Sequence, residues 1–186
     1  MRAWALASRG YCLLLPDPDA AAAPAPAAGE PATAPAPAFA LWEDVVRGGP
    51  EAEARVAWCG LKGRQRALEK VWRAYGGDVS RLGDVCRQAI AFDSPRDLLA
   101  GLRAVADDSD VRIRRVKNSL RAGHDAAATA GYRMVMVNLS LATDAARRLG
   151  ADVHVCELQL LLREFAALKS ESGHRRYRVF RDQRAE

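Results

Sequence analysis

Side chains in the second half of the chain have the types and the order that a nucleotide site would need. An aromatic ring comes first, Tyr132, and a carboxylate and an amide follow, Glu157 and Gln159. His174 and Tyr177 close the segment. A ring can stack on a planar group, and the remaining side chains can bind polar groups. This order suggests a nucleotide site built on a sheet.

A second carboxylate, Asp84, lies in another segment with the alternation of a half-buried strand. Side chains two residues apart on a strand share a face, so Asp84 shares one with Cys86 and Glu157 shares one with Gln159. If the two faces coincide, both carboxylates lie on one surface and could bind Mg²⁺ that bridges nucleotide phosphates. The alternative is that each is a strand-edge charge or an ion-pair partner of an arginine.

Periodicity and end signals predict the elements that would position these groups. One or two helices are expected over residues 52–75, and Gly76 and Gly77 end them. A further helix is expected after the cap Ser94-Pro95. The last helix is expected over residues 165–169, and Gly173 ends it. Strands are expected over residues 84–92, 111–117, 131–141 and 152–160. Candidate buried helix positions are Val56, Leu61, Leu68, Val71, Trp72, Leu98, Leu99, Leu102 and Val105. The order predicts an α+β fold with a mixed sheet of about four to five strands flanked by helices.

The 186 residues have room for one ordinary domain. Residues 20–40 are almost entirely Ala and Pro, a composition typical of a disordered linker. Residues 1–40 are therefore expected to be a leader or linker, and residues 41–186 the domain. The apolar run near the N-terminus is broken by Ser8, Arg9 and Gly10, which does not favour a secretory signal. No stretch is long and apolar enough to cross a bilayer, so no membrane partner is expected.

The four cysteines, Cys12, Cys59, Cys86 and Cys156, show no CxxC pair and no histidine at zinc spacing. This pattern favours reduced core thiols and an intracellular location. The formal net charge is +5, with arginines gathered in residues 112–115 and 175–184, where they could bind phosphate or form a solvated surface. Aromatic residues are not interleaved among them, which argues against nucleic acid as the partner. His124-Asp125 is interpreted as loop polarity and not as part of a phosphohydrolase site.

From Trp58 to Arg178 the sequence resembles the synthetase domain of the RelA/SpoT alarmone family, whose core is a nucleotidyltransferase-like mixed sheet. Lys62 and Lys70 stand at the separation of two family lysines, although Gly60 and Arg66 replace an arginine and a serine of that motif. Gly83-Asp84-Val85-Cys86-Arg87 matches the strand that begins with the metal aspartate of the family.

Three more motifs continue the resemblance in the family's order. Gly131-Tyr132-Arg133-Met134-Val135-Met136 keeps the tyrosine that stacks on guanine but has methionine in place of a serine and a histidine. Residues 157–162, Glu-Leu-Gln-Leu-Leu-Leu, keep the glutamate and glutamine but lose an arginine and a threonine. His174-Arg175-Arg176-Tyr177 keeps both ends of the His-Trp-x-Tyr motif.

The resemblance implies an enzyme that moves pyrophosphate from ATP to the 3′ hydroxyl of GDP or GTP with Mg²⁺. It implies Asp84 and Glu157 as catalytic metal ligands, with the substrate-binding residues Lys62, Lys70, Arg87, Tyr132, Gln159, His174 and Tyr177. Because polar groups are lost, a degenerate member that binds a nucleotide or a protein without turnover remains an alternative. A third hypothesis is a basic module that binds RNA through residues 175–184. The oligomeric state is left open.

Overall fold

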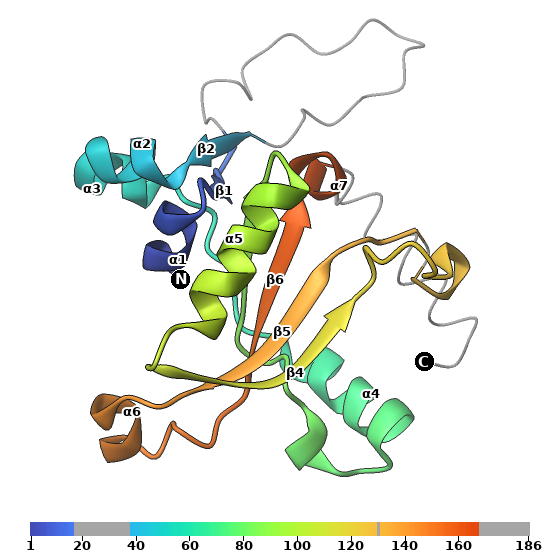
Figure 1. Cartoon of the computed structure of the whole chain (residues 1–186). Helices are drawn as coiled ribbons and strands as arrows, with labels where there is room; N and C mark the ends of the chain where they lie inside the picture. Colours follow the sequence, from blue (N-terminus) through green and yellow to red (C-terminus); the bar gives the residue numbers. More distant parts are fainter. Residues whose placement is uncertain (17–37, 130, 168–186) are drawn as a thin grey trace, which may run out of the picture.

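The computed structural model describes residues 1–16, 38–129 and 131–167, and these form a sheet with helices around it (Figure 1). The strands are β1 (Tyr11–Leu13), β2 (Phe39–Leu41), β3 (Arg87–Phe92), β4 (Val111–Asn118), β5 (Val135–Leu141) and β6 (Cys156–Leu162). The helices are α1 (Arg2–Ala7), α2 (Trp42–Arg47), α3 (Gly49–Ala54), α4 (Arg64–Tyr75), α5 (Pro95–Ala106), α6 (Asp144–Arg148) and α7 (Arg163–Ala167). Short 3₁₀ turns cover Val79–Arg81 and Ala126–Thr129.

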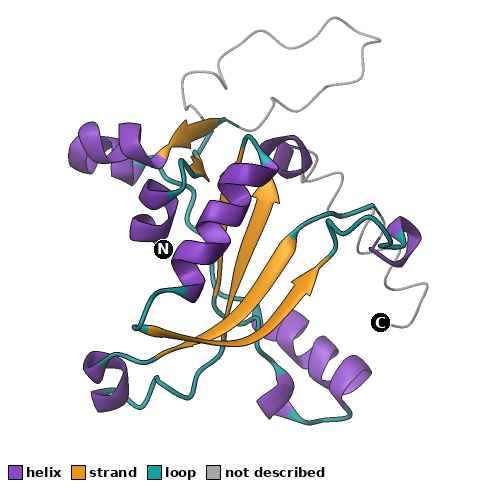
Figure 2. Cartoon of the chain, in the orientation of Figure 1, coloured by secondary structure: helices purple, strands orange, loops and turns teal. Residues whose placement is uncertain are grey.

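The strand order is β2-β1-β3-β6-β5-β4, and the sheet is mixed. β3 and β6 are parallel, whereas the other paired strands are antiparallel. The prediction of an α+β fold with a mixed sheet is therefore confirmed. The sheet has six strands and not four to five, because β1 and β2 come from segments that were not expected to be strands. Figure 2 shows the strands at the centre of the molecule and the helices around them.

One face of the sheet is the hydrophobic core, and α5 packs across it (Figure 1). Ile90, Val137 and Leu160, on β3, β5 and β6, have no exposed surface. β5, within the strand predicted over residues 131–141, has alternating burial: Val135, Val137 and Leu139 are buried, whereas Met136 and Asn138 are half-buried. The half-buried side chains therefore lie on the opposite face of the sheet.

α5 begins where its sequence signals predicted. The Ser94 Oγ accepts a hydrogen bond from the Asp97 N–H at 3.1 Å, and Pro95 is at the first turn, where its missing N–H costs nothing. Leu98 and Val105 are buried and Leu102 packs against the core, whereas Leu99 is 44% exposed. The predicted apolar stripe is therefore confirmed except at Leu99, which lies on the solvent side of the helix.

The N-terminal segment is part of the domain, contrary to the expectation that residues 1–40 are a leader or linker. Ala5 and Cys12 are buried, and β1 pairs with both β2 and β3. The Tyr11 hydroxyl donates to Asp93 Oδ2 at 2.6 Å, and Arg163 Nε binds the other oxygen of Asp93 at 2.8 Å. These contacts join β1 to the end of β3 and to the start of α7. The Ala/Pro-rich segment itself, residues 17–37, lies outside the described residues.

α4 is less buried than its sequence predicted. It ends at Gly76 as expected, with φ of 60°, but only Val71 of its residues is buried. Leu61, Leu68 and Trp72 are 74%, 50% and 70% exposed, so their prediction as buried positions was wrong. In Figure 1 the helix lies at the end of the sheet where β6 begins, and not across a face. Most of its surface therefore packs against no other helix or strand of the described residues.

The cysteines are all free thiols, as predicted. Cys12 is buried, Cys86 and Cys156 are half-buried, and Cys59 is exposed, so the interpretation as core thiols fails for Cys59. No helix in the described part of the chain has the length and apolar character that crossing a bilayer requires.

Gly101 gives a test of core packing. A Cβ at this position would lie 2.7 Å from Phe92 Cζ, and the Phe92 ring has no exposed surface. Gly101→Ala should lower the free energy of unfolding by about 1 kcal/mol, because overpacking outweighs the gain in helix propensity. Urea unfolding measures the change. Gly123→Ala, where a Cβ meets open space, is the control and should be nearly neutral. Equal effects of the two variants would contradict the packing argument.

Candidate functional site

Asp84 is the centre of a buried cluster of charges. Its Oδ2 accepts from Lys62 Nζ at 2.8 Å and from Lys70 Nζ at 2.9 Å. The side chains of Asp84 and Lys62 are each 11% exposed, and that of Lys70 is 27% exposed. The two lysines singled out in the sequence therefore meet on one carboxylate oxygen, which compensates their charge where little water reaches.

Local contacts fix the backbone of Lys62 and of the residues next to Asp84. Asp84 lies in a turn before β3, not on the strand as predicted. The Asn138 amide donates to the Gly83 carbonyl at 3.0 Å, and a Cβ on Gly83 would approach Val155 Cγ1 to 3.1 Å. The Lys62 N–H donates to the Val85 carbonyl at 2.9 Å. The chain is thus held on both sides of Asp84.

The ion pairs shift the pKa values of the three groups. Burial alone would raise the pKa of the Asp84 carboxyl, but hydrogen bonds from Lys62 and Lys70 hold that pKa below 3.8. Burial opposes the charge of Lys70, yet its bond to Asp84 and its proximity to Tyr75 raise its pKa above 10.5. Burial lowers the pKa of Lys62 and outweighs its bond to Asp84. The carboxylate and the Lys70 ammonium are therefore both charged at neutral pH.

The second oxygen of Asp84, Oδ1, is buried and has no hydrogen-bond partner in the described part of the chain. A buried carboxylate oxygen without a partner is costly, and a cation or a donor on a ligand could satisfy it. Carboxylate oxygens are the ligands that Mg²⁺ prefers, so Asp84 fits the predicted metal in its chemistry. Among the described residues, no cluster of three or more acidic, His or Cys side chains could hold a metal by itself.

Glu157 is near the start of β6, opposite Arg87 of β3 and Asn138 of β5 in the sheet register. Its Oε1 accepts from Gln159 Nε2 at 2.6 Å. The Glu157 N–H also donates to the Cys86 carbonyl at 2.9 Å, which joins the start of β6 to the segment that carries Asp84. These bonds place Glu157, Gln159 and Arg87 on the half-buried face of the sheet, beside the turn of Asp84.

Lys117 of β4 is a candidate that the sequence analysis missed. It is in register with Met136, which pairs with Gln159, so it lies on the same face as the predicted residues. Burial and the charges of Arg115 and Lys70 lower its pKa, whereas Glu157 and Asp84 oppose that shift. Lys117 therefore contributes to the electrostatic environment of both carboxylates. The alternation of Arg115 and Lys117 on a predicted strand was the signal that could have identified it.

Tyr132 is not beside the carboxylates. It precedes β5, which begins at Val135 and not at Gly131 as predicted. Since β5 is antiparallel to β6, with Val135 paired to Leu160, Tyr132 lies towards the end of β6 while Glu157 lies near its beginning. The two residues therefore come from different ends of the β5–β6 pair.

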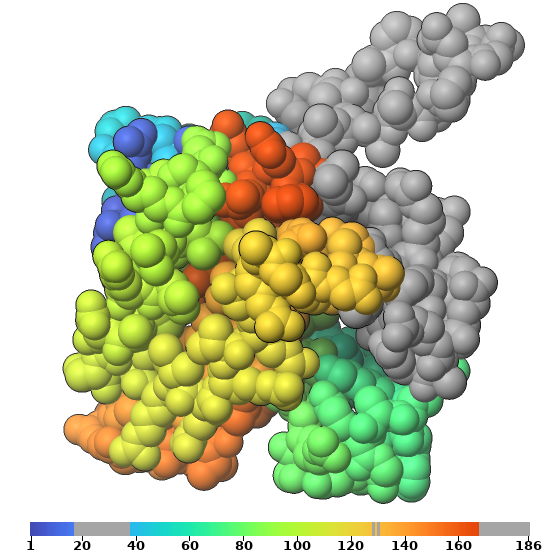
Figure 3. All heavy atoms as spheres, turned by 45° about the vertical axis from the view of Figure 1, so that its right-hand side comes forward, coloured from blue at the N-terminus to red at the C-terminus, as the bar shows by residue number. Residues whose placement is uncertain are grey.

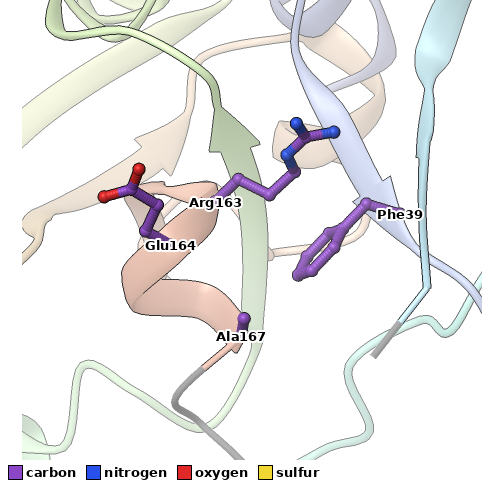
Figure 4. A pocket seen from close by; sticks show the side chains of 4 residues that line it. All are labelled: Phe39, Arg163, Glu164 and Ala167. Atoms are coloured by element: carbon purple, nitrogen blue, oxygen red, sulfur yellow. The ribbon is translucent and has the colours of Figure 1, made fainter. Parts of the chain in front are cut away.

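Two predicted site residues, His174 and Tyr177, lie outside the described residues, as do the tail arginines. An open hollow of about 390 Å³ is present elsewhere, lined by Phe39, Arg163, Glu164 and Ala167 (Figure 4). It lies beyond the end of β6, whereas Asp84 and Glu157 lie at the beginnings of the parallel strands β3 and β6. The hollow is therefore separate from the candidate site.

The described part of the chain has an α+β fold with a mixed sheet flanked by helices. Its fold is similar to that of small alarmone synthetase 1 from Bacillus subtilis bound to its product pppGpp, at 14% identity and a TM-score of 0.53. It is also similar to a GTP pyrophosphokinase family protein from Streptococcus pneumoniae, at 18% identity and a TM-score of 0.50. Each match covers 64% of this chain and 59% of the other protein. The sequence matches no protein-family model and none of the curated proteins.

Proposed function

We propose that this chain binds ATP and a guanine nucleotide and transfers pyrophosphate from ATP to the 3′ hydroxyl of GDP or GTP. The observation that carries the proposal is the Lys62–Asp84–Lys70 cluster beside Glu157, on a fold shared with small alarmone synthetases. Phosphate groups need cations. The cations here are Lys62 of the loop before α4, Lys70 of α4, Arg87 of β3 and Lys117 of β4. His174 and Tyr177 are proposed as further substrate contacts on the resemblance of their motif alone.

In the proposed reaction the 3′ hydroxyl oxygen of the acceptor forms a bond to the β-phosphorus of ATP. The bond from that phosphorus to the oxygen of the leaving AMP breaks, and the hydroxyl proton passes to Glu157 as general base. Gln159 holds the Glu157 carboxylate through its 2.6 Å hydrogen bond. Tyr132 is proposed to stack on the guanine base on the resemblance of its motif alone.

Asp84 and Glu157 would hold Mg²⁺, which neutralises charge on the phosphates when it is bound. For Asp84 the oxygen available to the metal is the partnerless Oδ1. ATP phosphates would then compete with Asp84 for the two lysine ammonium groups. Nucleotide binding is therefore expected to loosen the ion pairs of the apo protein.

A specific observation favours a second function, nucleotide binding without turnover. Met134 and Leu161, at positions where the family has a serine and an arginine, are 8% and 3% exposed. They pack as apolar side chains and offer no polar group to a transition state. The site would then retain recognition but lack part of the catalytic machinery.

One experiment distinguishes the two functions. The purified protein is incubated with ATP, Mg²⁺ and each of GDP, GTP and GMP, and the nucleotides are separated by anion-exchange chromatography. Equal amounts of AMP and a pyrophosphorylated guanosine nucleotide are expected from the transferase. Saturable binding of ATP or GDP by calorimetry without AMP would support the second function, and absence of both would contradict the nucleotide site.

A further inference from the structure

A buried serine joins the two ends of the connection between β4 and β5 by hydrogen bonds. Ser119 is 7% exposed, and its N–H and Oγ donate to the Met134 carbonyl at 3.0 and 2.9 Å. The Met134 N–H donates back to Ser119 Oγ at 2.8 Å. The two ends of the connection are thus joined one residue after Arg133.

The Arg133 side chain binds backbone carbonyls at several points of the connection. Its Nη1 donates to the carbonyls of Ser119 and Arg121 at 3.2 and 3.4 Å, and its Nη2 donates to the carbonyl of His124 at 3.5 Å. No carboxylate of residues 1–16, 38–129 or 131–167 forms a salt bridge with it. A guanidinium has donors on a rigid fork and can bind several carbonyls at once. The geometry of Arg133 is therefore that of a clamp on the backbone.

The adjacent residue, Tyr132, is bound within the same connection. Its N–H donates to the Thr129 carbonyl at 3.0 Å, and its carbonyl accepts from Thr129 Oγ1 at 2.9 Å. His124 Nε2 lies 3.0 Å from the same hydroxyl. Gly131, with φ of 81°, makes the preceding turn, and its N–H donates to the Ala126 carbonyl at 2.8 Å. The backbone position of Tyr132 therefore depends on the fold of this connection.

We infer that Arg133 is a positioning residue, which sets the place of Tyr132 by binding the backbone carbonyls of residues 119, 121 and 124 and not by contacting nucleotide phosphate. The inference rests on the proposed function, because it takes Tyr132 as the platform for the guanine base. Arg133 reduces the conformational freedom of the connection before the nucleotide binds. Binding then loses less conformational entropy, and the affinity is higher. Its effect should fall on the guanine nucleotide and not on ATP.

Two substitutions and a matched control test this role in the full-length protein. Arg133→Ala removes the clamp, and Arg133→Lys keeps the charge but lacks the planar fork. Arg121→Ala is the control, since it removes the same charge from an exposed position of the same connection while its backbone carbonyl stays. Thermal melting first establishes that each variant is folded.

Hydrogen exchange of the nucleotide-free protein should be about tenfold faster in residues 119–134 for both Arg133 variants, and unchanged for Arg121→Ala. The affinity for GDP should fall several-fold in both Arg133 variants, with the affinity for ATP unchanged. Exchange at the wild-type rate in Arg133→Ala, or GDP affinity restored by Arg133→Lys, would overturn the inference and show a charge contact instead. Failure of the wild-type protein to bind GDP would refute the proposed function. The hydrogen-exchange rates would still show whether Arg133 stabilises the connection.

Discussion

Asp84→Asn is expected to lower the free energy of unfolding by about 3 kcal/mol at neutral pH. The substitution keeps the shape of the side chain but leaves the ammonium groups of Lys62 and Lys70 close together without their shared carboxylate. Removing one partner of a buried pair costs roughly 3–5 kcal/mol, and the partial exposure of Lys70 places this case at the lower end. Urea unfolding followed by circular dichroism measures the change.

The same variant should lose a pH dependence. The pKa of Asp84 is lower in the folded chain than its ordinary value of 3.8, so the folded state binds fewer protons than the unfolded state over that interval. The stability from this carboxylate is therefore fully present above about pH 5 and is lost as the pH falls through the folded pKa. The difference in stability between wild type and Asp84→Asn should accordingly shrink below pH 3.8.

A triple variant provides the control for the charge argument. Adding Lys62→Met and Lys70→Met to Asp84→Asn removes the unpaired ammonium groups, and most of the lost stability should return. A loss of less than 1 kcal/mol in Asp84→Asn alone would show that water or flexible side chains compensate the charges. The ion pairs of the cluster would then contribute little to the stability of the fold.

The elements that were predicted well from the sequence are specified by residues within the element or next to it. The Ser94 and Pro95 cap and the leucine stripe specify α5 within a few residues, and alternation specifies the centre of β5. The N-terminal strands carry no such signal. β1 and β2 have three residues each, they pair across an Ala/Pro-rich segment, and β1 reaches β3 at Tyr11 and Ala91. A short strand formed by long-range pairing leaves little pattern in its own sequence.

The candidate site shows the same limit. The types and spacing of Lys62, Lys70 and Asp84 marked them for chemistry, and the structure brings them together. Their mutual ion pairs, however, depend on the turn that precedes β3 and on the position of α4 at the end of the sheet, which no local pattern specifies. Tyr132 was expected on the strand face, but the strand begins three residues later. Strand ends depend on pairing partners, which are distant in sequence.

Glu157→Gln should reduce the proposed pyrophosphate transfer by 10² to 10⁴-fold, the usual effect of removing a general base. Glutamine keeps an Oε1 that can accept the hydrogen bond from Gln159, so the stability should change little. The rate of AMP formation in a single turnover measures the chemical step. Glu164→Gln is the matched control, because this glutamate is exposed and follows the other end of β6.

The Mg²⁺ dependence then separates the two roles proposed for Glu157. If the carboxylate acts chiefly as a metal ligand, raising the Mg²⁺ concentration should restore much of the rate, because the substitution weakens a binding step. If it acts chiefly as the base, the maximum rate should stay low at every Mg²⁺ concentration, since no remaining group takes the hydroxyl proton. A rate above half that of the wild type would contradict both roles. Asp84, with its buried and partnerless Oδ1, would then be the only carboxylate of the pair left for the metal.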